Sequence, residues 1–386
     1  MKKKNVAIIA GGYSSEFEVS IRSAENLYAF IDKEKYNAFK VIITKDKWVV
    51  VSSQCQIDGC LSKCSETEKL VLSVAEGKNL KDPSTSLRMT AVAKQEHLIV
   101  EAQDDSSTSS PPPSGELEGA YIDKNDFSFR YGNETIRFDF AYITIHGTPG
   151  EDGLLQGYFD MIGIPYSTCG VFTSALTFNK YTCKQFLKNH GIAISDSILL
   201  RKGQPVNTET IVNELGLPVF VKPNDGGSSF GITKVKEAPQ IQPAIEKAFQ
   251  EGSEVMIERY VQGTELTCGC YKTNHKIVVF PVTEVVPDNE FFDYGAKYNG
   301  ESQEITPARI SDELTETIQR ETEKIYEFIG ANGIIRVDFI VTSDEIPVML
   351  EVNTTPGMTV ASFIPQQVQA AGLNMTDIMT DIIEKR

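Results

Sequence analysis

Four polar side chains, two acidic, one amide and one cationic, occur in a pattern that could bind a metal ion. They are Arg336, Asp338, Glu351 and Asn353. Carboxylate and amide oxygens are hard ligands that suit Mg²⁺ better than Zn²⁺, and this set leaves room for water and phosphate oxygens. Charges on a half-buried surface are costly unless a ligand compensates them. The alternative interpretation is a solvated sheet face that carries an ordinary Arg/Glu cross-strand pair.

A β-hairpin would bring these four side chains together. Apolar and polar residues alternate through residues 334–341, which predicts a half-buried strand, and a second apolar run follows at 346–352 after a short polar turn. The expected register places Arg336 directly opposite Glu351, with Asp338 diagonal to Glu351. A slip of one residue would move these groups to opposite faces of the sheet.

Composition indicates a soluble protein of two or three domains. The chain has 386 residues, of which 41% are hydrophobic, so it can bury more than one core. A net charge of -16 argues against a protein that binds nucleic acid or an anionic membrane electrostatically. We find neither a signal-peptide core nor an apolar stretch long enough to span a membrane, and the seven cysteines are scattered. We therefore expect a cytoplasmic protein with reduced thiols.

The first part of the chain predicts an open parallel α/β sheet. Residues 5–10 form an apolar run typical of a buried parallel strand, Gly11 and Gly12 follow, and a helical pattern continues to about residue 30. Ligands of such sheets bind beyond the carboxyl ends of the strands, where Glu16 falls. An acidic residue near a helix N-terminus is also favourable without a ligand. The glycine pair lacks the spacing of a dinucleotide fingerprint.

Residues 52–119 interrupt this pattern. They lack a sustained period, and the Ser/Pro-rich segment 104–115 has the composition of a linker, which predicts an inserted, largely unstructured excursion. Its possible zinc ligands lack the paired C-x₂-C spacing, so we interpret them as a fortuitous set. They are Cys55, Cys60, Cys64 and His97.

Two glycine-rich loops follow predicted strands and could bind anions. His146 begins the first loop, after a strand at 138–145 and before a helix at 154–161, where backbone N–H groups and the helix dipole favour negative charge. Lys222 ends a strand at 217–222 and precedes the Gly/Ser-rich loop 223–231, which could lie over phosphates although it is not a Walker loop. A structural histidine and a flexible hairpin turn are the alternatives.

Two further elements carry charged candidates. Residues 173–190 predict one amphipathic helix with Lys180 and Lys184, and residues 254–260 alternate as a strand with Glu258 near its end. From the residues alone, a nucleotide site between these elements is permitted but not required.

Six segments in this order resemble the D-alanine:D-alanine ligase family of the ATP-grasp superfamily. They are Gly11 to Ser20, His146 to Gly153, Lys222 to Gly231, Asp293 to Tyr298, Arg336 to Asp338 and Glu351 to Met358. The resemblance covers nearly all of the chain except about 52–120. Phe17 departs from the polar residue that is commoner at its position in the family, which leaves Glu16 intact.

The resemblance implies a multidomain α/β and α+β fold. An N-terminal open parallel α/β domain at 1–168, with the insertion at about 52–119, would precede two ATP-grasp subdomains with antiparallel sheets at 169–257 and 258–386. The implied activity is ATP-dependent ligation of two D-alanines through D-alanyl phosphate, with release of ADP and phosphate, for peptidoglycan precursor synthesis. The resemblance also implies a homodimer that forms through the first domain.

The resemblance also implies roles for individual residues. ATP would be bound by Lys180, Lys222, Ser228, Ser229, Glu258, Val261 and Glu265. Two Mg²⁺ ions, or Mn²⁺, would be held by Asp338, Glu351 and Asn353. The catalytic residues would be Glu16, Ser228, Arg336 and Gly357. The amino-acid substrates would be bound by Glu16, His146, Lys297, Tyr298, Ser362 and Phe363.

Within these sets, Arg336 and the Gly357 N–H would stabilise the tetrahedral oxyanion. Lys297 and Tyr298 would lie on a lid that excludes water, and Tyr298, Ser228 and Glu16 would form a polar triad between the lid and the first domain. The family members that make D-alanyl-D-lactate differ in the lid, so Tyr298 favours a dipeptide product, although D-serine is harder to exclude. The alternative from another functional class is a homologue that binds ATP but does not catalyse a reaction.

Overall fold

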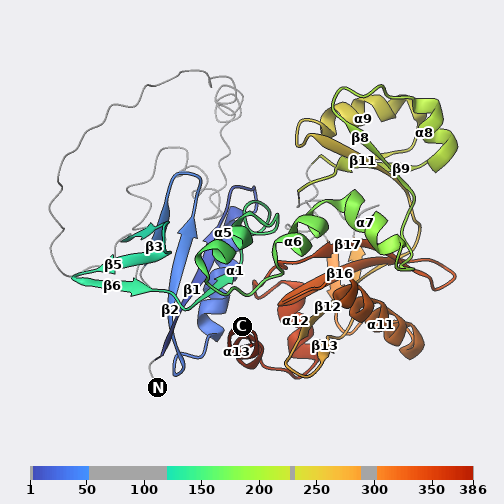
Figure 1. Cartoon of the computed structure of the whole chain (residues 1–386). Coiled ribbons are helices and arrows are strands. Elements are labelled where there is room, and N and C mark those ends of the chain that lie inside the picture. The colour runs from blue at the N-terminus through green and yellow to red at the C-terminus, as the bar shows by residue number, and fades with distance from the viewer. Residues whose placement is uncertain (1–2, 52–119, 227–230, 288–301, 386) are drawn as a thin grey trace, which may run out of the picture.

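The structure is a computed structural model that describes residues 3–51, 120–226, 231–287 and 302–385 (Figure 1). The expected excursion at 52–119 and the zinc ligands considered within it lie outside the described residues. Figure 1 shows three sheets, one in the N-terminal part and two in the rest of the chain.

The N-terminal sheet is mixed rather than wholly parallel. Its strands in spatial order are β6 (Glu134–Arg137), β5 (Ser128–Tyr131), β4 (Ala120–Asp123), β3 (Trp48–Val51), β2 (Tyr36–Ile43), β1 (Lys4–Gly11) and β7 (Phe140–Ile143). Helix α1 (Phe17–Phe30) crosses from β1 to β2, and these strands pair in parallel, as do β1 and β7. Short turns join β2 to β3, β4 to β5 and β5 to β6, and such turns connect antiparallel neighbours. The expectation of a parallel sheet is correct only for β2, β1 and β7.

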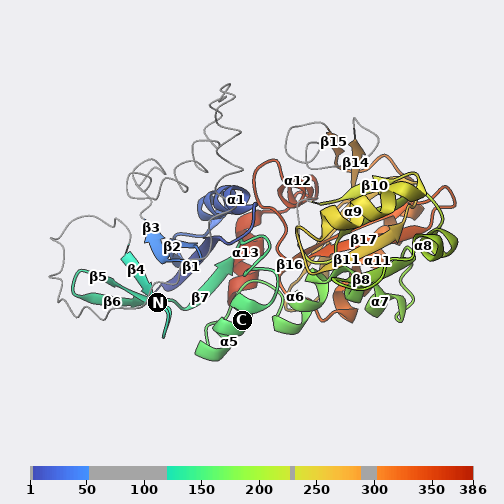
Figure 2. The same cartoon turned by 90° about the horizontal axis from the view of Figure 1, so that it is seen from above.

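Helices cover both faces of this sheet. Helix α1 buries Ser20, Ser23, Ala24 and Leu27, at the spacing of one helical face. Helix α13 (Met375–Glu384), the last helix of the chain, packs beside α1 in the same apolar cluster, whereas α5 (Leu154–Ile162) covers the opposite face (Figure 2). The C-terminal helix thus completes a core of the N-terminal sheet.

The second sheet is antiparallel and has four strands. In spatial order they are β10 (Thr233–Val235), β9 (Val219–Pro223), β11 (Glu254–Arg259) and β8 (Ser197–Arg201). Helices α8 (Thr208–Leu215) and α9 (Ile241–Ala248), the latter preceded by the 3₁₀ turn η1 (Ala238–Gln240), pack on it around one apolar cluster. Strand β11 continues past residue 257, where we expected one unit to end, and the division of the chain into domains stays a prediction.

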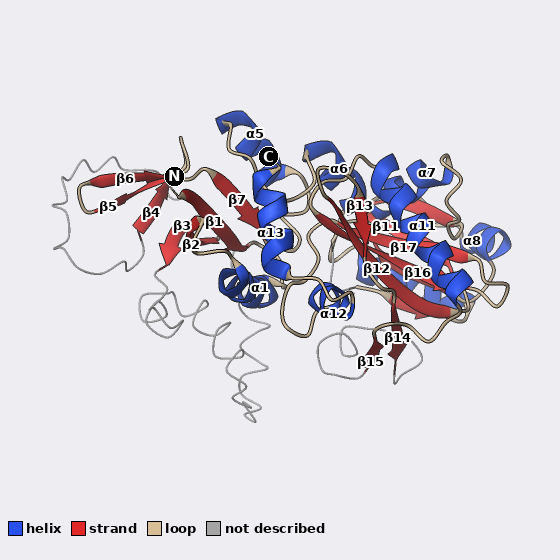
Figure 3. Cartoon of the chain, turned by 90° about the horizontal axis from the view of Figure 1, so that it is seen from below, coloured by secondary structure: helices blue, strands red, loops and turns tan. Residues whose placement is uncertain are grey.

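The third sheet is also antiparallel and carries the hairpin. Its strands are β15 (Ser302–Ile305), β14 (Thr283–Pro287), β12 (Thr264–Lys272), β16 (Ile334–Val341) and β17 (Pro347–Asn353), with β13 (Ile277–Val279) paired to β12. The helices beside it are α6 (Val171–Phe178), α7 (Lys180–Lys188), α11 (Asp312–Phe328) and α12 (Phe363–Ala370), as Figure 3 shows. Across the described ranges, no helix is both long and apolar enough to cross a membrane.

The single helix expected at 173–190 is two helices. Asn179 separates α6 from α7 with an extended backbone, and its side-chain oxygen accepts a hydrogen bond from the Thr182 N–H at 2.9 Å. Asparagine is a preferred N-cap because this bond satisfies an otherwise unpaired N–H. The break places Lys180 at the N-terminus of α7.

The predicted hairpin forms, but the predicted register was wrong by two residues. Asp338 lies opposite Glu351 and Arg336 lies opposite Asn353. One residue of the shift comes from the turn, because Val341 pairs with Pro347, and the second comes from a bulge in β17 beyond Asp338. At Arg336 and Asp338 the two contributions add to a shift of two residues, which keeps these side chains on the same face as Glu351 and Asn353.

Candidate active site

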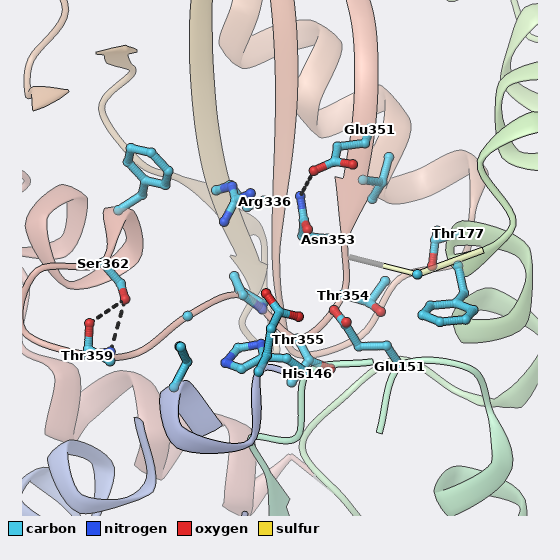
Figure 4. Close-up of a pocket in the computed structure, with 18 of the residues that line it drawn as sticks. His146, Glu151, Thr177, Arg336, Glu351, Asn353, Thr354, Thr355, Thr359 and Ser362 are labelled. Carbon is cyan, nitrogen blue, oxygen red and sulfur yellow. Dashed lines mark hydrogen bonds between the residues drawn. The ribbon is translucent and has the colours of Figure 1, made fainter. Parts of the chain in front are cut away.

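Two cavities meet beside the hairpin. The loop cavity, about 250 Å³, lies among α1, the turn after β7, the end of β17 and the start of α12 (Figure 4). The sheet cavity, about 430 Å³, lies between the four-stranded sheet and the sheet that contains the hairpin. Lys180, Arg336, Glu351 and Phe363 line both cavities. A molecule bound in one cavity can therefore meet a molecule bound in the other at these side chains.

Arg336 and Asp338 form a buried ion pair at this junction. Arg336 donates from Nε to Oδ1 and from Nη2 to Oδ2 of Asp338, both at 2.8 Å. Asp338 also accepts from Thr267 Oγ1 at 2.5 Å and from Asn353 Nδ2 at 3.1 Å, and the Asn353 amide lies 3.5 Å from Glu351 Oε1. Burial alone would lower the pKa of Arg336, but Asp338 raises it above its ordinary value, so the guanidinium stays charged.

The donor set of Asp338, Glu351 and Asn353 fits a hard cation. It offers carboxylate and amide oxygens beside the two cavities, where water or phosphate oxygens could complete the shell. Within the described residues, no group of three or more His, Cys, Asp or Glu side chains could hold a metal ion. Mg²⁺ commonly binds through one or two carboxylates together with substrate phosphates, which this donor set matches.

Glu258 and Lys222 line the sheet cavity, and Lys184 contacts Glu258 from behind this wall. Lys222 Nζ lies 2.6 Å from Glu258 Oε2, and Lys184 and Ser195 both contact Glu258 Oε1. Lys184 is 1% exposed in its side chain and also donates to the Met349 carbonyl at 3.2 Å. Although burial alone would raise the pKa of Glu258, the two lysines lower it to about 2.

Lys180 extends from the N-terminus of α7 toward the Gly/Ser-rich loop. Its Nζ contacts the Gly226 carbonyl, and its backbone N–H donates to the Asn224 carbonyl at 3.2 Å. Burial lowers the pKa of Lys180, and Glu351 opposes this effect. Val261 and Glu265 lie on the wall of the sheet cavity.

The turn after β7 brings two acidic groups and a histidine together. Glu16, at the start of α1, and His146 are both buried and line the loop cavity. Glu151 lines it too, and its Oε2 accepts a hydrogen bond from the Gly147 N–H at 2.7 Å. Burial raises the pKa of Glu151 to about 7, and the negative charge of the nearby Glu16 adds to this effect.

The opposite wall of the loop cavity consists of the segment before α12. Ser362 Oγ lies 2.8 Å from Thr359 Oγ1 and accepts from the Thr359 N–H at 3.1 Å (Figure 4). A Cβ on Gly357 would lie 2.8 Å from Ser362 Oγ, so glycine permits this close approach. The guanidinium of Arg336 lies 5.1 Å from the centre of the Phe363 ring.

Both the N-terminal and the C-terminal parts of the chain match a known protein family. Residues 5–169 match the description "D-ala D-ala ligase N-terminus", and residues 186–384 match "D-ala D-ala ligase C-terminus". The chain belongs to the D-alanine–D-alanine ligase family. The resemblance inferred from the six segments is thus confirmed.

Relatives in this ligase family match over nearly their whole length. The D-alanine–D-alanine ligase of Parabacteroides distasonis is 54% identical over 382 residues, which are 99% of this chain and 97% of that protein. The D-alanine–D-alanine ligase of Bacteroides fragilis is 53% identical over 384 residues, which are 100% of this chain and 99% of that protein.

Solved ligase structures share the fold. VanG D-Ala:D-Ser ligase from Enterococcus faecalis has a TM-score of 0.74 at 28% identity, with 99% of both chains covered. D-alanyl-alanine synthetase A from Vibrio cholerae has a TM-score of 0.76 at 25% identity, with 100% of this chain and 98% of that chain covered. The expected combination of an N-terminal α/β part and ATP-grasp parts is confirmed, with the mixed first sheet as a refinement.

The structure brings most of the residues implied by the family resemblance to the two cavities. The loop cavity contains Glu16, His146, Lys180, Arg336, Glu351, Asn353, Gly357, Ser362 and Phe363. The sheet cavity contains Lys180, Lys222, Glu258, Val261, Glu265, Arg336, Asp338, Glu351 and Phe363. Ser228, Ser229, Lys297 and Tyr298 lie outside the described residues.

Sequence reasoning for this ligase assigned no role to three charged residues at or beside the site, although it named Lys184 as a candidate. Lys184 lies one helical turn after Lys180, on the buried face of α7, and that position could have identified it. Glu151 belongs to the same glycine-rich segment as His146 and was not assigned a role. Glu304 lines the loop cavity and accepts from Gln366 Nε2 at 2.6 Å, and no signal in the sequence indicates this.

Proposed function

We propose that this chain joins two D-alanines to D-alanyl-D-alanine at the expense of ATP, for peptidoglycan precursor synthesis. The observation that carries the proposal is the Arg336–Asp338 pair, which lies with Glu351 and Asn353 where the two cavities meet. A phosphoryl donor in the sheet cavity and amino acids in the loop cavity would react at this junction. Family membership supports the same substrates.

ATP occupies the sheet cavity in this proposal. Lys180 and Lys222 contact its phosphates, Glu258 and Val261 contact the adenine, and Glu265 contacts the ribose. The two lysines reach this cavity from α7 and β9, where Lys222 is also paired with Glu258, and both ammonium groups can form charge-assisted hydrogen bonds with phosphate oxygens. Ser228 and Ser229, which lie outside the described residues, are proposed as further ATP-binding residues on the basis of the family resemblance.

Asp338, Glu351 and Asn353 hold two Mg²⁺ ions in this proposal, and Mn²⁺ can substitute for them. When bound, the ions neutralise charge on the phosphate oxygens during transfer. Asp338 is held in one orientation by Arg336 and Thr267, so the donor face is set before the metal arrives.

The reaction has two steps. In the first step, a carboxylate oxygen of the first D-alanine attacks the γ-phosphorus, the bond to the leaving oxygen breaks, and ADP departs. In the second step, the amine of the other D-alanine attacks the carbonyl carbon of D-alanyl phosphate. The carbon–oxygen bond to phosphate breaks, the amine loses its proton, and dipeptide and phosphate remain.

Individual side chains orient these reactants. Glu16 binds the first substrate's ammonium and His146 its carboxylate region, while Ser362 and Phe363 hold the second substrate. Arg336, together with the Gly357 N–H, donates to the oxyanion of the tetrahedral intermediate. Such preorganised donors contribute about 3 to 4 kcal/mol each because they need no reorganisation during the reaction.

For Lys297 and Tyr298, which lie outside the described residues, the proposal keeps the role implied by the family resemblance, that of a lid over the site. Closure excludes the water that would hydrolyse D-alanyl phosphate, and a triad of Tyr298, Ser228 and Glu16 would hold the closed state. The proposal also includes a homodimer that forms through the first domain, and a location in the cytoplasm, where ATP is available.

The test measures phosphate release and dipeptide formation together. With ATP, Mg²⁺ and D-alanine, both products should appear in equal amounts, and omission of either Mg²⁺ or D-alanine should abolish both. Nucleotide binding without D-alanine-dependent phosphate release would instead support a non-catalytic ATP-binding protein. Parallel reactions with D-lactate and D-serine test the identity of the second substrate. Phosphate release with D-alanine plus D-lactate, but not with D-alanine alone, would refute dipeptide synthesis.

A further inference from the structure

Helix α1 holds the backbone of the segment that carries Gly357. The Met358 N–H donates to Ser23 Oγ at 3.1 Å, and the Met358 carbonyl accepts from Asn26 Nδ2 at 2.6 Å. Ser23 is fully buried, and the Met358 side chain packs in the same apolar cluster as Ala24 and Leu27. Two side chains of one helix therefore satisfy both backbone groups of the residue that follows Gly357.

The same helix also lines the loop cavity. Glu16, Val19 and Arg22 are spaced three residues apart and form one wall of this cavity. Further along α1, Ser23 and Asn26 contact the segment that carries Gly357. Figure 3 shows α1 and α12 near each other, although they come from opposite ends of the chain. A short rigid helix thus links the group assigned to the first substrate's ammonium with the segment assigned to the oxyanion.

The Gly357 segment is also tied internally. Ser362 forms hydrogen bonds with Thr359, and a side chain on Gly357 would displace Ser362, since its Cβ would lie 2.8 Å from Ser362 Oγ. This internal turn sets the shape of the segment, but it does not set where the segment lies relative to Glu16. The contacts of Met358 with α1 bridge the two walls of the cavity.

We propose that Ser23 and Asn26 are positioning residues that set the Gly357 N–H relative to Glu16 and Arg336. The inference rests on the proposed function, because it assigns the Gly357 N–H to the oxyanion. Oxyanion donors act at short range and with fixed direction, so a displaced amide loses much of its effect on the transition state while the nucleotide site is unchanged.

The experiment compares Ser23→Ala, Asn26→Ala and Asn26→Asp with the unchanged protein. Asn26→Asp keeps the shape of the side chain but replaces the donor by a carboxylate that repels the Met358 carbonyl. We expect kcat to fall about 10- to 100-fold in each variant, because small misplacements at a reacting centre have effects of this size. The KM for ATP should change less than about twofold, since the lost interaction acts only in the transition state.

A second readout reports the oxyanion site directly. A phosphinate dipeptide analogue has a tetrahedral phosphorus and an anionic oxygen in place of the intermediate's carbon and oxyanion. Its inhibition constant should rise in parallel with the fall in kcat/KM, as expected for a transition-state analogue. If Ser23 and Asn26 had only a structural role, the inhibition constant would not rise in proportion to the fall in kcat/KM.

Thr376→Val is the matched control. Thr376 Oγ1 donates to the Phe30 carbonyl at 2.7 Å, so it is another hydrogen bond between α1 and the C-terminal part, distant in sequence from Gly357. The control should lower the melting temperature as the test variants do, but retain kcat and analogue binding.

The outcomes separate two failures. If the unchanged protein forms no dipeptide, the proposed function fails. If the unchanged protein forms dipeptide but the folded variants of Ser23 and Asn26 retain kcat and analogue affinity, the positioning role is refuted. It is also refuted if Thr376→Val loses as much kcat as the variants of Ser23 and Asn26. Because Ser23 and Asn26 are changed separately, one variant that fails to fold leaves the other to decide.

Discussion

Arg336 and Asp338 pair bidentately within a single strand, with both donor–acceptor distances at 2.8 Å. The two side chains are neighbours on one face of β16, and Glu351 and Asn353 flank them from β17. The guanidinium is thus oriented by a carboxylate that is also assigned to the metal. In the proposed function, the charge assigned to the oxyanion and a charge assigned to Mg²⁺ are thus paired with each other.

Replacement of Arg336 by lysine should therefore reduce activity despite the retained charge. A lysine ammonium cannot make the two parallel bonds to Asp338, so the cation loses its fixed direction. We expect kcat to fall at least about 100-fold, while ADP binding, measured by calorimetry, stays close to that of the unchanged protein. Arg309→Lys is the control, because Arg309 pairs bidentately with Glu284 at 2.8 and 2.9 Å and is exposed. Equal losses in both variants would contradict the assignment.

Glu351→Gln should raise the Mg²⁺ concentration required for activity. The substitution keeps the shape of the side chain but removes one of two carboxylates, and the remaining ligands attract the cation less strongly. We expect the half-saturating Mg²⁺ concentration to increase at least about 10-fold, as seen when a metal site is weakened. Chelation with EDTA should abolish turnover of the unchanged protein.

Glu304→Gln controls for the charge of the loop cavity, because Glu304 lines this cavity outside the donor set and is held by Gln366. Its Mg²⁺ requirement should match that of the unchanged protein. An unaltered Mg²⁺ requirement in Glu351→Gln would remove Glu351 from the metal site.

Lys184→Met should destabilise the protein and make it more sensitive to acid. It removes one of the two cations that pair with the buried Glu258, and breaking such a pair costs about 3 to 5 kcal/mol. The pKa of Glu258 is lowered to about 2, so its contribution to stability is present above its ordinary value of 4.5 and is lost as the pH falls toward 2. Without Lys184 the pKa rises, and acid unfolding should begin at a higher pH.

Urea denaturation at several pH values measures both effects. Lys188→Met is the matched control, because Lys188 lies one turn further along α7, is exposed, and is 3.7 Å from Asp196. A similar loss of stability in the two variants would show that the buried pair has no special role.

Glu151→Gln should flatten the dependence of stability on pH near neutrality. The folded-state pKa of about 7 lies above the ordinary value of 4.5, so the folded protein binds more protons between these values and loses stability as the pH rises from 4.5 to 7. A glutamine cannot ionise, and it can still accept from the Gly147 N–H. At pH 8 the variant should be more stable than the unchanged protein by up to about 3 kcal/mol.

Thermal unfolding from pH 4.5 to 8 tests this expectation. Asp152→Asn, which removes the neighbouring carboxylate, should keep the slope of the unchanged protein. A slope in Glu151→Gln that equals the slope of the unchanged protein would assign the pH dependence to another group.

The alternating pattern of residues 334–341 was enough to predict which face carries Arg336 and Asp338, because side-chain direction in a strand follows the local backbone. The same reasoning failed for the register with β17. The length of the turn and the bulge in β17 depend on pairing between strands, and alternation within one strand contains no information about either.

The sequence by itself determined the family and the chemical types of the side chains at the candidate site, because these depend on residue identity and spacing along the chain. Only the tertiary structure decided that Lys184 supports Glu258, that Glu151 and Glu304 line the loop cavity, and that α1 holds Met358. These contacts join segments that are distant in the chain. Burial and charge at such contacts arise from packing, which no local pattern specifies.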